Sequence, residues 1–302
     1  MIANPIPWPS GYRCAVAITW DMDADSGLNF YNPDRADTLV ASQSYTRYGP
    51  LIAIPRIVAL LRRLDLRQTF FIPGWCIEKY PAAVELLLEA GHELALHGYL
   101  HERPNELSAE DERYWLQRGI AAFVRFAGAR PRGWRAPSFA FSKHSLGYLI
   151  AEGFEYDSSL MGDDIPYLLQ HRSGSLVELP TDWTLDDWPH YMFNRDFRIA
   201  MPISAPRRAM EVFQAEFDAA WQHGGLWVGV WHPFLSGRLA RLGAVEELIR
   251  HMQGKRGVWF ASLAEICAHV KAVTAQAAWT PRVEALPLYD SPIPEFQKVA
   301  IA

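Results

Sequence analysis

The strongest constraint on the fold is the regular alternation of short apolar runs with longer segments of helical periodicity. The apolar runs have the length of strands and lie at residues 14–20, 68–72, 93–97, 133–136, 156–160, 176–180, 226–231 and 257–261. The helical patterns lie at residues 51–64, 81–90, 109–127, 143–152, 206–222, 239–253 and 263–273. A strand-helix-strand order repeated about seven times predicts a parallel sheet covered by helices.

The number of repeats favours one closed barrel. Seven or eight units in about 260 residues predict an α/β fold with a single distorted (β/α)7–8 barrel, and a doubly wound open sheet is the alternative. We therefore expect one catalytic domain over residues 1–302, with its barrel core at 14–265. Residues 26–50 break the alternation and are expected to form a loop over the site or a subunit contact. The tail at 277–302 carries four prolines and is expected to wrap over the surface.

Composition excludes several classes of protein. With 12 Trp, 12 Tyr and 15 Phe among 302 residues, the chain has too much buriable surface to be disordered. A net charge of −5 argues against a nucleic-acid or membrane-surface partner. Three well-separated cysteines indicate neither a disulfide framework nor a thiolate zinc site. The N-terminus lacks the basic start and apolar run of a signal peptide, so we expect a cytoplasmic protein.

Polar and charged residues that can bind a metal ion or transfer a proton follow the ends of several predicted strands. They are Asp21, Asp23, His97, His101, Arg135, Asp182 and His232. In a barrel the carboxyl ends of the strands form one face, which is the catalytic face. We therefore expect these side chains to meet.

Two histidines and one carboxylate form a typical set of ligands for a divalent metal ion. Asp23, His97 and His101 supply such a set, and the His-x-x-x-His spacing places both imidazoles on one side if the segment turns helically. Gly98 permits other backbone paths. Asp21 and Asp23 are separated by one residue, and two carboxylates so close suggest that one binds metal while the other acts as a base on water.

Arg135 and His232 complete the predicted chemistry. Arg135 precedes Ala136-Pro137 at a strand end, where its guanidinium can hold Asp21 ionised. His232 follows a strongly apolar strand and can protonate a leaving amine, given a carboxylate beside its second nitrogen. The sequence does not choose among the candidate acids Asp182, Asp186 and Asp187, and Asp182 is included in the predicted catalytic set.

The order of these motifs resembles the polysaccharide deacetylase family, also called the NodB-homology or carbohydrate esterase 4 family. The matching motifs are Asp-x-Asp, His-x-x-x-His, Arg-x-Pro, an Asp-Trp region and a late His, within residues 14–265. The chain departs from the common pattern at three places: Met22 is inserted between the acids, Gly98 follows the first His, and Trp231 precedes the late His. These departures resemble the branch of Helicobacter-type peptidoglycan deacetylases, cyclic imidases and allantoinases. Three further segments strengthen the match, at residues 156–160, 178–183 and 185–189.

The resemblance implies a NodB-type distorted barrel that hydrolyses non-peptide C–N bonds with a divalent metal. Zinc is the expected ion, with Co²⁺, Mn²⁺ and Ni²⁺ as alternatives. Carried over by position, Asp21 is the base, Arg135 orients it and His232 is the general acid. The metal ligands are Asp23, His97 and His101. A homo-oligomer, specifically a tetramer, is also implied.

The expected substrate is a small cyclic imide, amide or ureide. The missing export signal and the bulky rings near the predicted site favour it; the rings are Trp75, Tyr99, Trp134, Phe139, Trp183, Trp188 and Phe234. One alternative is deacetylation of an N-acetyl sugar in peptidoglycan or a chitooligosaccharide, since such rings also stack on sugars. Another is a non-catalytic homologue that binds metal or sugar, although the intact base and acid argue against it. A barrel oxidoreductase is disfavoured because no GxGxxG fingerprint is present.

Overall fold

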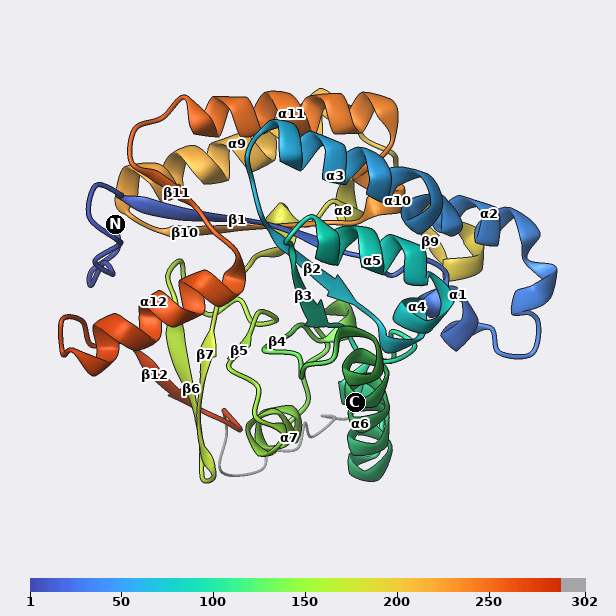
Figure 1. The fold of residues 1–302 in the computed structure, drawn as a ribbon, viewed down its shortest axis with the longest axis horizontal. Coiled ribbons are helices and arrows are strands. Elements are labelled where there is room, and N and C mark those ends of the chain that lie inside the picture. The colour runs from blue at the N-terminus through green and yellow to red at the C-terminus, as the bar shows by residue number, and fades with distance from the viewer. Residues whose placement is uncertain (289–302) are drawn as a thin grey trace, which may run out of the picture.

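The protein is described by a computed structural model over residues 1–288 (Figure 1). One 10-stranded sheet has the order β10-β1-β2-β3-β4-β5-β7-β6-β12, with β11 beside β1. Its strands are β1 (Cys14–Asp21), β2 (Thr69–Ile72), β3 (Glu93–Leu96), β4 (Gly133–Trp134), β5 (Tyr156–Asp157), β6 (Tyr167–His171), β7 (Gly174–Glu178), β10 (Leu226–Trp231), β11 (Val258–Phe260) and β12 (Val283–Ala285). A separate hairpin pairs β8 (Phe193–Asn194) with β9 (Ile199–Ala200).

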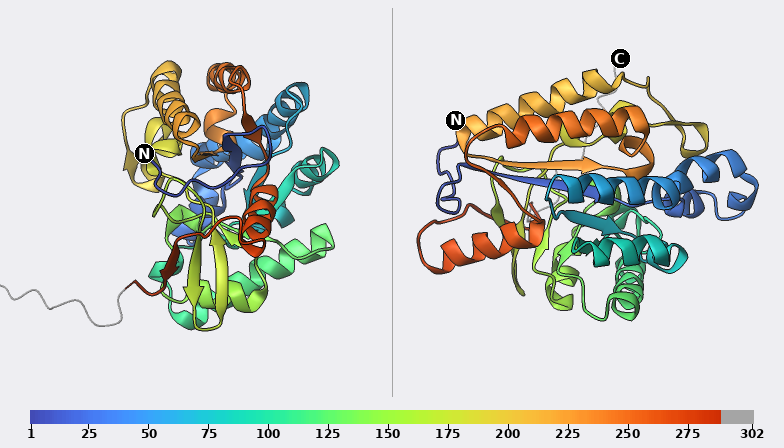
Figure 2. Two further views of the ribbon diagram at one scale, coloured as in Figure 1. Left: turned by 90° about the vertical axis from the view of Figure 1, so that its left-hand side faces the viewer. Right: turned by 45° about the horizontal axis from the view of Figure 1, so that its top comes forward.

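Helices form an outer layer around the strands, as the end-on view in Figure 2 shows. The α-helices are α1 (Ser26–Tyr31), α2 (Val40–Tyr48), α3 (Ile54–Arg63), α4 (Gly74–Lys79), α5 (Pro81–Glu89), α6 (Ala109–Ala127), α7 (Ser145–Glu152), α8 (Trp188–Tyr191), α9 (Pro206–His223), α10 (Pro233–Ser236), α11 (Leu239–Gln253) and α12 (Leu263–Ala275). Short 3₁₀ turns lie at Ala36–Thr38, Pro104–Glu106, Pro137–Phe139, Trp183–Leu185 and Arg195–Phe197, and a π-helical turn at Gly49–Ala53.

The sheet closes into a distorted barrel. Strand β1 pairs with β10 along one edge; its other edge meets β11 near its start and β2 near its end. The loop after β7 returns to β10, where the Thr181 hydroxyl donates to the Val228 carbonyl at 2.9 Å. The backbone N–H of Asp187 donates to the Val230 carbonyl at 3.0 Å. The predicted barrel is therefore confirmed, and the closure bonds distinguish it from an open sheet.

Alternate residues of β1 enter two apolar cores, because successive side chains of a strand point to opposite faces. Val16, Ile18 and Trp20 belong to the core that the sheet forms with α3, α9 and α11. Ala15 and Ala17 pack inside, with residues of α12. Thr19 and Asp21 share the parity of Ala15 and Ala17, so their side chains are directed to the inner face at the carboxyl end of the strand.

The prediction of a loop at residues 26–50 was wrong, because this segment contains α1 and α2. Helix α2 has a mostly polar sequence, so its periodicity is weak. Tertiary contacts stabilise it instead: the Ser42 hydroxyl donates to the Asp196 carboxylate at 2.6 Å, and the Asn194 side-chain amide donates to the Ser42 hydroxyl at 3.0 Å. Propensity alone rarely determines whether a helix forms, and packing decides such cases.

The antiparallel β6–β7 hairpin was also not predicted, and it extends one edge of the otherwise parallel sheet. Strand β12, within the tail expected to wrap over the surface, pairs with β6 over Val283–Ala285. The remainder of that tail, residues 289–302, lies outside the described residues. Cys14, Cys76 and Cys267 are all buried and free. Over residues 1–288, no helix combines the length and apolarity needed to cross a membrane.

Candidate active site

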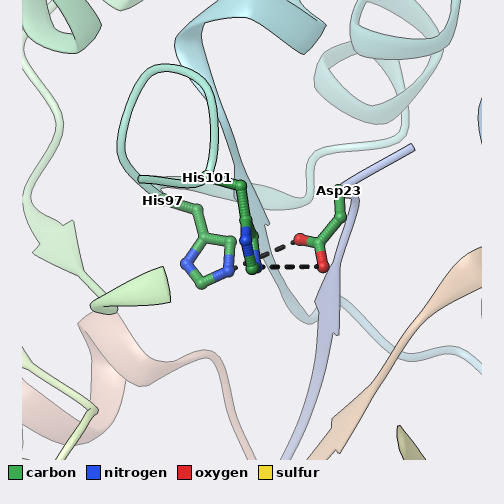
Figure 3. Close-up of side chains that lie close together, drawn as sticks. All are labelled: Asp23, His97 and His101. Atoms are coloured by element: carbon green, nitrogen blue, oxygen red, sulfur yellow. Dashed lines mark ion pairs between the residues drawn. The ribbon is translucent and has the colours of Figure 1, made fainter. Parts of the chain in front are cut away.

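Asp23, His97 and His101 converge at the carboxyl end of the barrel (Figure 3). Asp23 follows β1, and both histidines lie in the loop after β3. The His97 Nε2 lies 3.4 Å from Asp23 Oδ1, and the His101 Nε2 lies 3.3 Å from Asp23 Oδ2. All three side chains are buried. The sequence prediction that these residues meet is therefore matched by their placement.

The hydrogen bonding of this cluster fits a divalent metal ion. Within residues 1–288, neither carboxylate oxygen of Asp23 has a hydrogen-bond partner although both are buried. Such atoms carry a free-energy cost unless something binds them. The His97 Nδ1 lies 2.8 Å from the Arg135 carbonyl, so its proton resides there and the Nε2 lone pair faces Asp23. Burial lowers the pKa of His97 to about 4, which keeps the imidazole neutral as a ligand must be.

The histidine loop is not helical, contrary to one reading of the His-x-x-x-His spacing. Gly98 and His101 adopt positive φ angles of 68° and 61°. The buried Glu102 carboxylate fixes the turn by accepting backbone N–H groups from Tyr99 at 2.8 Å and Leu100 at 2.6 Å. A Cβ atom at Gly98 would lie 2.8 Å from Glu102 Oε1, so glycine is required. Glu102 was not among the predicted site residues, and its position next to His101 is the only signal for it in the sequence.

Arg135 holds the Asp21 carboxylate in place by a hydrogen bond. Its Nη1 lies 2.7 Å from Asp21 Oδ1 and 2.7 Å from the Thr19 hydroxyl, and its remaining nitrogens donate to Ser158. The guanidinium is fully buried and stacks 4.0 Å from the centroid of Phe71. Asp21 Oδ2 remains directed at the histidines, 3.8 Å from His97 Nε2. One oxygen of Asp21 is thus fixed while the other faces the cluster.

His232 is held by Asp187, and the inclusion of Asp182 was wrong. The His232 Nδ1 lies 2.7 Å from Asp187 Oδ1, and its Nε2 lies 3.4 Å from Asp23 Oδ2. Burial opposes charging of the imidazole, but the Asp187 and Asp23 carboxylates outweigh it and raise the pKa of His232 well above its ordinary value. Asp182 is exposed and caps the Trp183–Leu185 turn by accepting the Thr184 N–H at 2.7 Å. Only four residues separate the two acids along the loop, and sequence patterns do not resolve so small a difference.

A cavity of about 530 Å³ opens onto the cluster. Of the rings predicted near the site, Phe139, Trp183, Trp188 and Phe234 line it. Trp75, Tyr99 and Trp134 do not line the cavity, and Tyr99 and Trp134 are buried among other side chains. Two further rings in the lining, Tyr31 from α1 and Phe197 from the turn before β9, were not predicted from the sequence. Asp186 also faces the cavity, and burial raises the pKa of its carboxyl to about 7.

Known proteins similar to this chain include deacetylases and an allantoinase. Residues 48–156 match the model of the family described as Polysaccharide deacetylase. A peptidoglycan deacetylase of Helicobacter pylori is 29% identical over 281 residues, 83% of this chain and 94% of that protein. An allantoinase structure is 22% identical, with a TM-score of 0.78 over 89% of this chain and 95% of that one, and shows the same fold.

A crystal structure of a protein from Mycobacterium smegmatis assigned as a polysaccharide deacetylase is more similar still. It is 40% identical with a TM-score of 0.88, over 98% of this chain and 99% of that one. Agreement in sequence and in fold over nearly the whole length exceeds what a shared barrel alone produces. The chain therefore belongs to the polysaccharide deacetylase family and is a hydrolase of carbon–nitrogen amide bonds.

Proposed function

We propose that the protein is a metal-dependent hydrolase whose substrate is a small cyclic imide, amide or ureide. One observation carries the proposal. A carboxylate fixed by a buried arginine (Asp21) and an imidazole fixed by a buried carboxylate (His232) both face the same set of unpaired metal-type ligands. A general base and a general acid that both face one metal-binding cluster are the groups that hydrolysis of an amide bond requires.

Asp23, His97 and His101 are the proposed metal ligands, with zinc expected because two imidazoles and a carboxylate suit it. When bound, the ion would polarise the acyl oxygen and make water more acidic. Asp21 takes the proton of the attacking water at Oδ2, while Arg135 holds Oδ1 in place. As the C–N bond breaks, His232 gives the proton on Nε2 to the departing nitrogen, and Asp187 stabilises the imidazolium.

The cavity supports a small substrate. A volume of about 530 Å³ is in the usual range for small-molecule sites, and aromatic rings suit a flat ring. The proposed catalytic residues all lie within the 14–265 barrel core, and we propose that residues 1–302 act as one catalytic domain. The tetramer and the cytoplasmic location stay predictions, which light scattering and cell fractionation test.

Deacetylation of an N-acetyl sugar is the second candidate. It is favoured by the similarity to the Helicobacter pylori peptidoglycan deacetylase over most of both chains. Trp183, 48% exposed beside Phe139 at the cavity, offers a face on which a sugar could stack. A non-catalytic homologue is disfavoured, because Asp21, Arg135 and His232 are all present and positioned.

Parallel assays distinguish these functions. The zinc-loaded protein is incubated with succinimide, allantoin and an N-acetylglucosamine oligomer, and ring opening and acetate release are measured. Ring opening without acetate release supports the proposal. Acetate release alone replaces it with the sugar function, and no metal-dependent product from any of the three contradicts both.

A further inference from the structure

Two arginines line the cavity, and no step of the proposed hydrolysis uses them. Arg103 follows the histidine loop, and Arg198 lies in the β8–β9 hairpin. Both are near the end of α1. Arg103 lies beside Tyr31, and the Asn32 side chain reaches the carbonyl of Asp196, two residues before Arg198, at 3.5 Å. Segments distant in sequence thus place two cations in the lining of one cavity.

One donor of Arg103 has no partner among the described residues. Its Nε is buried and has no hydrogen-bond partner within residues 1–288. Its Nη1 donates to Glu106 at 2.6 Å, but these side chains are 37% and 51% exposed. Exposed ion pairs contribute little free energy, so this one is easily exchanged for another anion. A buried N–H without a partner costs more and indicates a missing acceptor.

Arg198 has no acidic partner in the described part of the chain. The nearest acid in sequence, Asp196, is engaged elsewhere, with the Ser42 hydroxyl at 2.6 Å and Arg35 at 3.8 Å. Arg198 also adopts a φ of 57°, a conformation that glycine or asparagine takes at lower cost. Residues kept in such conformations concentrate at functional sites.

We propose that the substrate carries a carboxylate, which Arg103 and Arg198 bind while the amide bond lies between Asp21 and His232. Guanidinium groups suit this role because their planar donors match the two carboxylate oxygens. The proposal rests on the proposed function and narrows its substrate class to anionic amides. The carboxylate has two potential sources: a small ring acid, or the lactyl group of a muramic acid in peptidoglycan.

Binding is measured separately from turnover. The zinc-loaded Asp21→Asn variant is titrated calorimetrically with hydantoin-5-acetic acid and with 5-ethylhydantoin, which has similar size and no carboxylate. Adding Arg198→Ala or Arg103→Ala should weaken binding of the acid by about tenfold and change binding of the neutral ring by less than about twofold. Arg207→Ala is the matched control, because Arg207 is exposed and does not line the cavity. If Arg103→Ala does not fold, Arg103→Lys replaces it, since lysine keeps the charge but lacks the fork.

Equal affinity for the acid and the neutral ring would overturn the proposal, as would a preference for the acid that survives both arginine substitutions. A muramic-acid disaccharide and chitobiose, titrated in the same way, form a second pair. Selective binding of either acid supports the proposal and identifies the source of the carboxylate. Failure of the proposed function appears differently, as the absence of metal-dependent turnover of any of these amides by the unsubstituted protein.

Discussion

His232 and Asp187 are joined at two places. The imidazole Nδ1 lies 2.7 Å from one carboxylate oxygen of Asp187, and the backbone N–H of His232 donates to the other oxygen at 3.0 Å. The Ser236 hydroxyl donates to that second oxygen as well. Asp187 is fully buried, so the ring is fixed in orientation, with Nε2 directed at Asp23. This arrangement supports the general-acid role that we propose for His232.

Replacing Asp187 by Asn should lower kcat by about 100-fold or more, because an amide cannot stabilise the imidazolium. Zinc content, measured by mass spectrometry, should stay near that of the unsubstituted protein. Asp182→Asn is the matched control, since Asp182 is exposed and caps a turn. A comparable loss of kcat in both variants would show that Asp187 has no special role.

Substitutions at Asp21 and at His101 should separate the loss of catalysis from the loss of bound metal. Asp21→Asn should abolish hydrolysis and leave bound zinc nearly unchanged, because Arg135 and not the cluster holds its fixed oxygen. His101→Ala should remove the zinc, since it deletes one of the proposed ligands. Loss of zinc in the Asp21 variant would mean that Asp21 is also a ligand. Full activity of the His101 variant would contradict the ligand set.

Arg135→Lys should destabilise the protein by about 2–4 kcal/mol and abolish most activity. A lysine cannot reproduce the fork that serves Asp21, Thr19 and Ser158, so buried polar atoms lose their partners. Urea unfolding measures the stability. Arg132→Lys, at an exposed ion pair with Glu155, is the control and should cost less than about 1 kcal/mol. Equal losses in the two variants would contradict the importance of burial.

Two glycines with nearly the same φ angle test whether the turn that carries His97 and His101 requires glycine. Gly98 has φ 68° and Gly128 has φ 69°, but only at Gly98 would a Cβ meet a near neighbour, Glu102 at 2.8 Å. Gly128→Ala should cost about 1 kcal/mol of backbone strain and keep zinc bound. Gly98→Ala should cost more and weaken zinc binding, because the turn that carries His97 and His101 must shift. Unaltered zinc affinity in Gly98→Ala would show that the loop tolerates another path.

Stability should fall with acid partly through His92, far from the cluster. Burial, with the charges of Arg62 and Arg67, lowers the pKa of His92 to about 4, and its Nδ1 accepts the Gln68 N–H at 3.2 Å. The folded state therefore favours the neutral ring. Its contribution is complete above the unfolded pKa of about 6.5 and is lost as the pH falls towards 4, by about 2 kcal/mol.

Chemical unfolding at pH 7 and pH 4.5 measures this loss, and His92→Asn, which keeps an acceptor near the Nδ1 position, should reduce it. The same pH dependence in the variant would assign the loss to other groups. Zinc-free protein is used at both pH values, so that metal release does not contribute.

The sequence by itself predicted the barrel and most residues of the candidate site, because both depend on local patterns. Strand β10 and helices α6 and α11 have the bounds that periodicity predicts, since apolar faces repeat wherever an element packs on a core. Asp21, Asp23, His97, His101, Arg135 and His232 could be predicted because each lies at or just after the end of a strand, and parallel strands bring their carboxyl ends to one face.

Tertiary structure decided what depends on contacts between distant segments. Helix α2 is stabilised through Ser42 and Asp196, 154 residues apart, which no local pattern encodes. The choice of Asp187 over Asp182 depends on the bond between the Asp187 N–H and the Val230 carbonyl, which closes the barrel and places the carboxylate beneath His232. The meeting of Arg103 and Arg198 at one cavity likewise follows from chain packing, because a side chain's surroundings are fixed only when the whole fold is formed.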